Sequence, residues 1–250
     1  MRRESFEDRV DQAWAGHFGC TGEEVRLPGT VLLVRERMRG SGEIHLTHLR
    51  ARTFAELGPD LQMELVDASR RAGWNGNLSA EALRQLLPAR RLGASHRGLI
   101  FHLDPERLAL RLPEAPTHLR ALTEGDQPAL HALCERCSPQ EVDDAYVDLG
   151  HEVVCGCFEA KQLVAAGSGY RRNGFLDIGV ITDPAFRGRR LAPAIAAAIS
   201  RDGIQKGLIA QYRCDVQNAS SIRVAERAGF TRLFTYEVQE IRPGEQTAAG

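Results

Sequence analysis

The segment spanning residues 175–206 constrains the fold of this 250-residue chain more than any other. Residues 175–182 are apolar and of strand length, and the alanine-rich run 191–206 has the composition of a helix. Between them the chain reads Arg187-Gly188-Arg189-Arg190-Leu191-Ala192. Unpaired N–H groups and the helix dipole attract anions to a helix start, and arginine forks match phosphate oxygens. The segment therefore predicts a strand, a phosphate-binding turn and a helix.

A second pattern follows about one element later. Residues 208–214 read as a strand, and after them come Asn218-Ala219-Ser220-Ser221, a short helical stretch and Gly229-Phe230. Asn and Ser are favoured at helix starts, and glycine is favoured just after helix ends. The order is thus strand, phosphate turn, helix, strand, Asn/Ser turn, short helix, Gly-Phe and strand.

These motifs resemble those of the GNAT superfamily of acetyl-CoA-dependent N-acetyltransferases. The family's phosphate motif, Arg/Gln-x-x-Gly-x-Gly/Ala, corresponds to residues 187–192, and its Asn-x-x-Ser/Ala…Gly-Phe motif corresponds to residues 218–230. The resemblance covers about residues 117–240. With its long N-terminal extension, the chain is also faintly similar to a two-domain branch of self-resistance acetyltransferases that act on amine antibiotics.

Two positions depart from the family pattern. Arg190 stands where the family usually has glycine, which lets the backbone approach the pyrophosphate without a Cβ. We expect Arg190 to be tolerated with a negative φ and an outward side chain that could contact phosphate. Ala225 stands where the family often has the tyrosine that protonates the leaving thiolate.

The resemblance implies acetyl-CoA as the cofactor. In the family two strands diverge beside the phosphate turn, and their free backbone groups bind the pantetheine arm and the thioester carbonyl. Residues 176–182 and 208–214 correspond to these strands, with the N–H near Val180 facing the carbonyl. A helix cap is an equal alternative role for Asn218. The implied cofactor residues are Ile178, Val180, Arg187, Gly188, Arg189, Arg190, Leu191, Ala192, Asn218 and Ser221.

An amine nucleophile must lose a proton, and a nearby carboxylate can accept it. Asp177, Asp215 and Glu152 are candidates, and Asp177 is preferred because it lies within an apolar strand beside the cofactor. Its alternative role is structural, as the partner of Arg171 or Arg172.

The leaving thiolate needs a proton donor. Tyr212 is the candidate catalytic acid and Cys214 a second one, although a plain sheet position is the favoured interpretation of each and water could serve instead.

Composition places the chain among soluble globular proteins. Its net charge of -1 gives no global basic surface for nucleic acid, and it has no apolar run of the eighteen or so residues that span a bilayer. The N-terminus does not read as a signal peptide. Six scattered cysteines suggest reduced thiols in the cytoplasm, and we interpret the Cys134/Cys137 and Cys155/Cys157 pairs as core thiols, not as metal ligands. No metal site is expected.

We predict an α+β protein with two domains. Residues 1–105 form an N-terminal α+β accessory domain that shapes the substrate pocket, either a degenerate GNAT-like half or a separate cap. Residues 117–241 form the GNAT domain, with a mixed, mostly antiparallel central sheet flanked by helices. A proline-rich boundary at 104–116 contains alternating leucines at 108, 110 and 112, which permit a strand there.

Periodicity and turn residues predict the elements of each domain. In the first we expect a helix at 6–18, strands at 31–34 and 44–49 joined by a hairpin-type connection at 40–42, helices at 59–72 and 79–88, and a strand at 98–103. In the second we expect strands at 119–122, 153–158 and 163–170, with a capping box at 138–141 and a hairpin turn at 159–162.

The leading hypothesis is an acetyl-CoA-dependent N-acetyltransferase. It transfers an acetyl group to a primary amine of a small molecule by direct attack in a ternary complex. The alternatives are a non-catalytic acyl-CoA-binding regulatory module and a protein or peptide N-acetyltransferase. A homodimer is a possible assembly.

Overall fold

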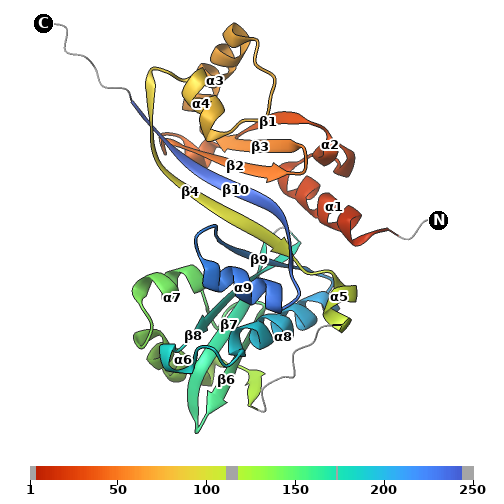
Figure 1. Ribbon diagram of the computed structural model, residues 1–250, viewed down its shortest axis with the longest axis vertical. Helices are drawn as coiled ribbons and strands as arrows, with labels where there is room; N and C mark the ends of the chain where they lie inside the picture. Colours follow the sequence, from red (N-terminus) through yellow and green to blue (C-terminus); the bar gives the residue numbers. More distant parts are fainter. Residues whose placement is uncertain (1–3, 111–117, 173, 244–250) are drawn as a thin grey trace, which may run out of the picture. The chain divides into compact units, whose positions relative to one another are not determined.

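The computed structural model of the protein describes residues 4–110, 118–172 and 174–243 (Figure 1). The chain forms two compact units, one made of residues 1–99 and 233–250 and the other of residues 100–232. The divisions fall within two long strands, β4 (Arg90–His102) and β10 (Thr231–Pro243). The functional domain limits expected from the sequence, 1–105 and 117–241, stay a prediction.

The first unit is α+β. Its strands lie in the order β1-β3-β2-β10-β4, where β1 is parallel to β3 and β2 is antiparallel to both β3 and β10. Its remaining elements are α1 (Phe6–Phe18), α2 (Gly22–Arg26), β1 (Gly29–Val34), β2 (Glu43–Leu49), β3 (Arg52–Leu57), α3 (Pro59–Ala72) and α4 (Ala80–Leu86).

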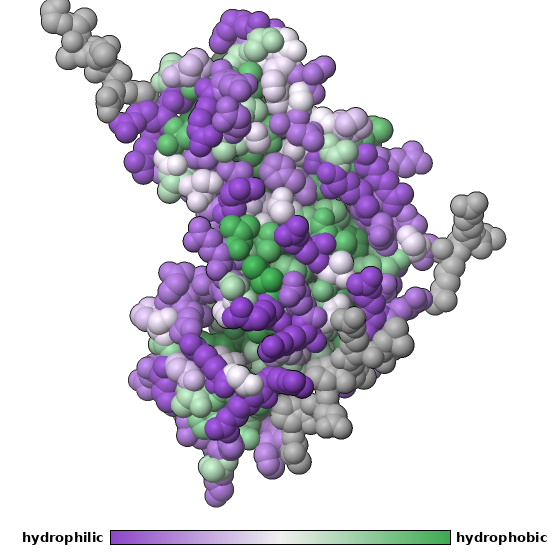
Figure 2. All heavy atoms as spheres, viewed as in Figure 1, coloured by the Kyte–Doolittle hydropathy of each residue, from purple (hydrophilic) through white to green (hydrophobic). Residues whose placement is uncertain are grey.

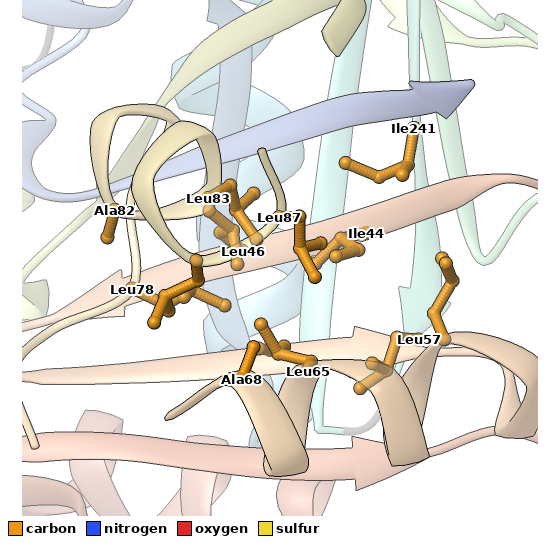
Figure 3. Close-up of a cluster of buried hydrophobic side chains, with 13 residues drawn as sticks. Ile44, Leu46, Leu57, Leu65, Ala68, Leu78, Ala82, Leu83, Leu87 and Ile241 are labelled. Carbon is orange, nitrogen blue, oxygen red and sulfur yellow. The ribbon is translucent and has the colours of Figure 1, made fainter. Parts of the chain in front are cut away.

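The helices expected at 6–18, 59–72 and 79–88 are present as α1, α3 and α4, the last ending at Leu86, whereas α2 was not expected. Ser79 Oγ accepts the N–H of Ala82 at the start of α4, and Pro59 occupies the first turn of α3. Gly73 ends α3 in the left-handed conformation. Leu65 of α3 and Leu83 of α4 are buried in an apolar cluster with residues of β2 and β3 (Figure 3). Amphipathic helices packed on one sheet face therefore make the core of this unit.

The hairpin-type connection expected at residues 40–42 is wrong. β1 pairs with β3, and β2 forms its hairpin with β3, a strand that the sequence pattern did not reveal. β3 is almost wholly buried, so its side chains show no alternation of polar and apolar residues. The turn before β3 contains no Gly, Pro or Asn that would mark it in the sequence. Arg50 takes the left-handed conformation there instead, at φ 54°.

The second unit contains the strand order β9-β8-β7-β6-β5, antiparallel except for the parallel pair β8 and β9. This confirms the mostly antiparallel sheet flanked by helices. The elements are α5 (Pro105–Leu110), β5 (Leu119–Ala121), α6 (Gln127–Glu135), α7 (Pro139–Ala145), β6 (Val153–Glu159), β7 (Gln162–Arg172), β8 (Phe175–Thr182), α8 (Leu191–Gln205), β9 (Ile209–Asp215) and α9 (Ala219–Arg227). The strand permitted by the alternating leucines is a helix, α5, over residues 105–110; Leu112 lies outside the described residues.

Helices cover both faces of this sheet. Gly167 and Gly169 of β7 lie under α8, because a Cβ at either position would meet Ile195 or Ile199 at 2.5–2.9 Å. On the other face, Ala166 and Ile181 join an apolar cluster that contains residues of α6 and α7. One face of the sheet is therefore covered by α8 and the other by α6 and α7.

Polar and charged side chains dominate the face drawn in Figure 2, as the 26% content of charged residues leads one to expect. Among the helices of the described residues, none has the length and apolar character needed to cross a bilayer.

Candidate functional site

The strands β8 and β9 pair over only part of their length. Within the described residues their parallel register runs from Phe175↔Ile209 to Ile178↔Tyr212, although β8 continues to Thr182 and β9 to Asp215. Beyond that point β8 keeps β7 on one side, and no strand of the described residues pairs with it on the other. Because backbone N–H and C=O groups need partners, residues 179–182 offer hydrogen-bonding groups to an extended ligand.

A turn opens α8 at the same end of β8. Gly188 has φ 79° and Arg190 has φ 61°, so both lie in the left-handed region, and no side chain caps the helix. The first intrahelical bond is made by Ala194 N–H to Arg190 C=O. The N–H groups of Leu191 and Ala192 thus point out of the helix start, where the helix dipole attracts anions.

The negative φ expected for Arg190 is wrong. The chain must reverse between the short 3₁₀ helix Pro184–Phe186 and α8, and it does so through two left-handed residues. Arg190 therefore keeps the backbone geometry of the family's glycine and adds a side chain to it.

Carboxylates neutralise two arginines of the turn. Arg187 Nη2 lies 2.7 Å from Glu141 Oε1, and Arg189 Nη1 lies 3.0 Å from Glu159 Oε2. Within the described part of the chain, no ion pair involves Arg190. A bound phosphate would compete with Glu141 and Glu159 for these guanidinium groups.

Asp183 fixes the base of the turn. Its carboxylate accepts the Ala185 N–H at 2.9 Å and Arg136 Nε at 2.5 Å, and only 3% of the residue is exposed. Burial acts to raise the pKa of Asp183, but the Ala185 hydrogen bond and Arg136 outweigh it, so the pKa is lowered. The sequence analysis missed this pair, although Asp before Pro is a recognisable start signal for a helical turn.

Asp177 lies on β8 and faces the α7 side of the sheet. Its Oδ2 accepts Arg213 Nε at 2.7 Å and the Tyr170 hydroxyl at 3.1 Å. The structural ion pair considered from the sequence is present, but its partner is Arg213 and not Arg171 or Arg172. Arg213 lies two residues beyond the register partner of Asp177, on the same face of the neighbouring strand.

The other two candidate bases lie in structural positions. Lys206 Nζ donates to the carbonyl of Glu152 at 3.0 Å and lies 3.8 Å from its carboxylate. Lys206 is the C-terminal cap of α8, a helix about 22 Å long. Glu152 therefore lies at the opposite end of α8 from the phosphate turn. Asp215 accepts the N–H of Gln217 at 2.6 Å in the connection to α9.

The proposed proton donors are poor acids. Burial raises the pKa of Tyr212 to about 12, with a smaller opposing effect of Ser221, and raises the pKa of Cys214 to about 11. A donor works best when its pKa lies near the working pH, so this shift disfavours the role of catalytic acid, which stays a prediction for Tyr212. Ala225 is a fully buried residue of α9.

Asn218 caps α9. Its Oδ1 accepts the N–H of Ser221 at 3.0 Å and the Ser220 hydroxyl at 2.7 Å. The cap considered as the alternative role of Asn218 is thus realised, and this cap also fixes Ser221 in the first turn of the helix.

Part of the chain is similar to known proteins. Residues 150–239 match the profile of the GNAT acetyltransferase family. A GNAT-family acetyltransferase from Colwellia psychrerythraea has a similar structure, with a TM-score of 0.51, 13% identity and coverage of 80% of this chain and 81% of that chain. A GCN5-related N-acetyltransferase from Sphaerobacter thermophilus has a TM-score of 0.47 and 20% identity, and the match covers 67% and 58% of the chains. Curated proteins give no match.

Proposed function

We propose that the GNAT acetyltransferase domain in the C-terminal unit of this chain transfers an acetyl group from acetyl-CoA to a primary amine of a small molecule. One observation carries the proposal: the open stretch of β8 ends at the uncapped, arginine-bearing start of α8. An extended thioester with a pyrophosphate at one end needs such a combination of free strand groups and an anion site.

The turn would hold the pyrophosphate through backbone N–H groups and the side chains of Arg187, Arg189 and Arg190. The pantetheine arm would lie along residues 179–182, with the thioester carbonyl near Val180. Ile178 ends the paired part of β8, and Asn218 and Ser221 at the start of α9 would contact the pantetheine arm or the adenosine. Hydrogen-bond donors that the strand fixes toward the carbonyl oxygen stabilise the negative charge that develops on this oxygen during attack.

Direct attack by the amine, without a covalent acyl-enzyme, agrees with the protonated state of Cys214. A covalent acyl-enzyme would require a thiolate, but burial raises the pKa of Cys214 to about 11, so its thiol stays protonated near neutrality. The amine nitrogen therefore attacks the thioester carbon, its proton goes to a base, and coenzyme A leaves as the thiolate that water protonates.

Asp177 is the base in this proposal. Tyr170 and Arg213 both contact its Oδ2, so Oδ1 is the atom that would receive the proton. Arg213 would keep the carboxylate in place during the transfer.

Calorimetric titration with acetyl-CoA, with free coenzyme A as the control, tests the cofactor site. Thiol release in the presence of a panel of primary amines then tests the reaction. Failure to bind either thioester or thiol would refute the cofactor assignment.

A non-catalytic acyl-CoA-binding module is the second candidate. It is favoured by Ala225, which places no hydroxyl at the position where the family often has its acid. Acetyl-CoA binding without thiol release for any amine would favour this candidate over the enzyme.

A further inference from the structure

Three aromatic rings form a cluster that the proposed reaction does not use. The ring centroids of Tyr146 and His151 are 5.1 Å apart, those of His151 and Tyr170 are 5.4 Å apart, and those of Tyr146 and Tyr170 are 5.6 Å apart. Tyr146 ends α7, His151 follows it in the connection to β6, and Tyr170 lies on β7. We call these three residues the ring cluster.

The ring cluster lies beside the open stretch of β8. The residue before Tyr146 packs its carbonyl against Gly179, the first residue of that stretch. Ser168, the register partner of Gly179 on β7, bonds through its Oγ to His151 Nδ1 at 2.8 Å. Tyr170 in turn contacts Asp177. The rings therefore border the proposed thioester site on the sheet face opposite α8.

Tyr146 adopts a conformation that its residue type disfavours. It has φ 45° and ψ 46° at the C-terminal cap of α7, a position where glycine or asparagine is usual, and 62% of the residue is exposed. A bulky residue in the left-handed region costs about 1 kcal/mol or more. Because an exposed tyrosine gains little stability from burial, this strain points to a role for its ring.

The segment that carries two of the rings is acidic. Residues 139–152 contain five acidic residues and no Lys or Arg, and four of these acids are exposed: Asp143, Asp144, Asp148 and Glu152. Burial lowers the pKa of His151 against an opposing effect of Asp148, so its ring is neutral near pH 7. Neutral aromatic faces and exposed carboxylates both attract cations.

We propose that the ring cluster binds a second ammonium group of the acceptor, so that the substrate class is small diamines and polyamines. This inference rests on the proposed acetyl transfer. One cationic nitrogen lies against the rings, in the field of the acidic segment 139–152, and another, deprotonated amine reaches the thioester beside Val180. A monoamine of the same length lacks the anchoring charge.

Paired substrates test the class. Thiol release from acetyl-CoA is measured with 1,4-diaminobutane, spermidine and n-butylamine. We expect kcat/KM for 1,4-diaminobutane and for spermidine to exceed that for n-butylamine by about tenfold. This is the size of the effect expected when aromatic faces bind a cation. Equal values for the three amines would overturn the inference.

The variant Tyr146→Gly tests the residue. Glycine removes the ring and also suits the left-handed backbone, so the fold should be retained or stabilised. We expect kcat/KM for 1,4-diaminobutane to fall about fivefold or more, whereas n-butylamine turnover and acetyl-CoA affinity stay unchanged. Tyr146→Phe keeps a ring and should keep most of the preference.

Lys161→Gly is the matched control. Lys161 also has a left-handed backbone, at φ 70° in the turn between β6 and β7, and its substitution relieves the same strain away from the rings. It should alter neither amine's kinetics. A preference that survives in Tyr146→Gly would overturn the role of the ring.

A binding measurement separates this inference from the proposed function. 1,4-Diaminobutane is titrated calorimetrically into the complex with coenzyme A, without turnover. If no amine releases thiol, the proposed acetyl transfer is refuted. Diamine binding that is lost in Tyr146→Gly would still support the ring cluster as a binding site. The absence of diamine binding would overturn the ring cluster.

Discussion

The carbonyl oxygen of Ala145, at the end of α7, would lie 1.7 Å from a Cβ built on Gly179 of β8. Gly179→Ala must therefore displace α7 or the strand, and overpacking of this kind costs about 1–3 kcal/mol. We expect a lower midpoint in chemical denaturation and weaker acetyl-CoA binding, because Gly179 begins the open stretch of β8. Gly16→Ala is the control: no atom lies within 4 Å of its Cβ position in α1, so it should stabilise the protein by about 0.5–1 kcal/mol.

The close approach of Ala145 to Gly179 could not have been read from the sequence. The strand, the turn and the helix were predictable because each leaves a local pattern: alternation, capping residues and helix-stopping glycines. The capping box at Ser138 and Glu141 is present as predicted. Gly179 looks like any glycine in a strand, and only the packing of α7 explains it.

Arg190→Gly should stabilise the protein by about 1 kcal/mol, since glycine adopts φ 61° without strain. Arg190→Ala removes the charge and keeps the strain. Thermal unfolding of the two variants separates backbone from charge, and acetyl-CoA titration shows whether the side chain contacts phosphate. A lower unfolding temperature for Arg190→Gly than for Arg190→Ala would contradict the strain argument.

Arg187→Ala should weaken acetyl-CoA binding by about 1–3 kcal/mol, the range for losing charge-assisted hydrogen bonds. Calorimetry measures it directly. An unchanged affinity would remove the phosphate assignment from the turn.

Glu159→Gln should have the opposite effect. It releases Arg189 from an exposed ion pair, which itself contributes little to stability. We expect tighter acetyl-CoA binding and an unchanged unfolding temperature, and weaker binding would mean that Glu159 positions Arg189 for phosphate.

Asp177→Asn should lower turnover and leave acetyl-CoA affinity unchanged. The amide can still accept a hydrogen bond from Arg213 but cannot take the proton of the amine. The measurement is kcat across a pH series. Glu152→Gln, at the far end of α8, is the control, and a pH–rate profile of Asp177→Asn identical to the unsubstituted protein would clear Asp177 of the base role.

Acid should destabilise the protein through His102 before most carboxylates are protonated. Complete burial lowers the pKa of His102 to about 3, whereas the unfolded side chain titrates near the ordinary histidine value of 6.5. The unfolded state therefore binds one more proton between these values, so stability falls as pH decreases from about 6.5, by at most about 1.4 kcal/mol per unit. Urea unfolding between pH 7 and 5 measures this slope. His102→Gln should reduce it, and an equal slope in that variant would contradict the assignment.

Side-chain partners formed the largest gap between sequence and structure. The alternative role considered for Asp177 paired it with its sequence neighbours Arg171 or Arg172, yet Arg213 reaches it from an adjacent strand. Likewise, Asp183 meets Arg136 across forty-seven positions of chain. Local periodicity predicts which face a residue occupies, but register between distant strands decides what it touches.

The interrupted make-up of the first unit has a consequence for biosynthesis. Residues 235–240 of β10 pair with residues 43–48 of β2, so the sheet of the unit that begins the chain stays incomplete until they have been translated. Residues 100–232 form the other unit, which is continuous in sequence and is fully translated before residues 233–250. Nascent chains usually fold from the N-terminus onward. Here we expect the unit of residues 100–232 to fold on the ribosome before β2 has its partner strand β10.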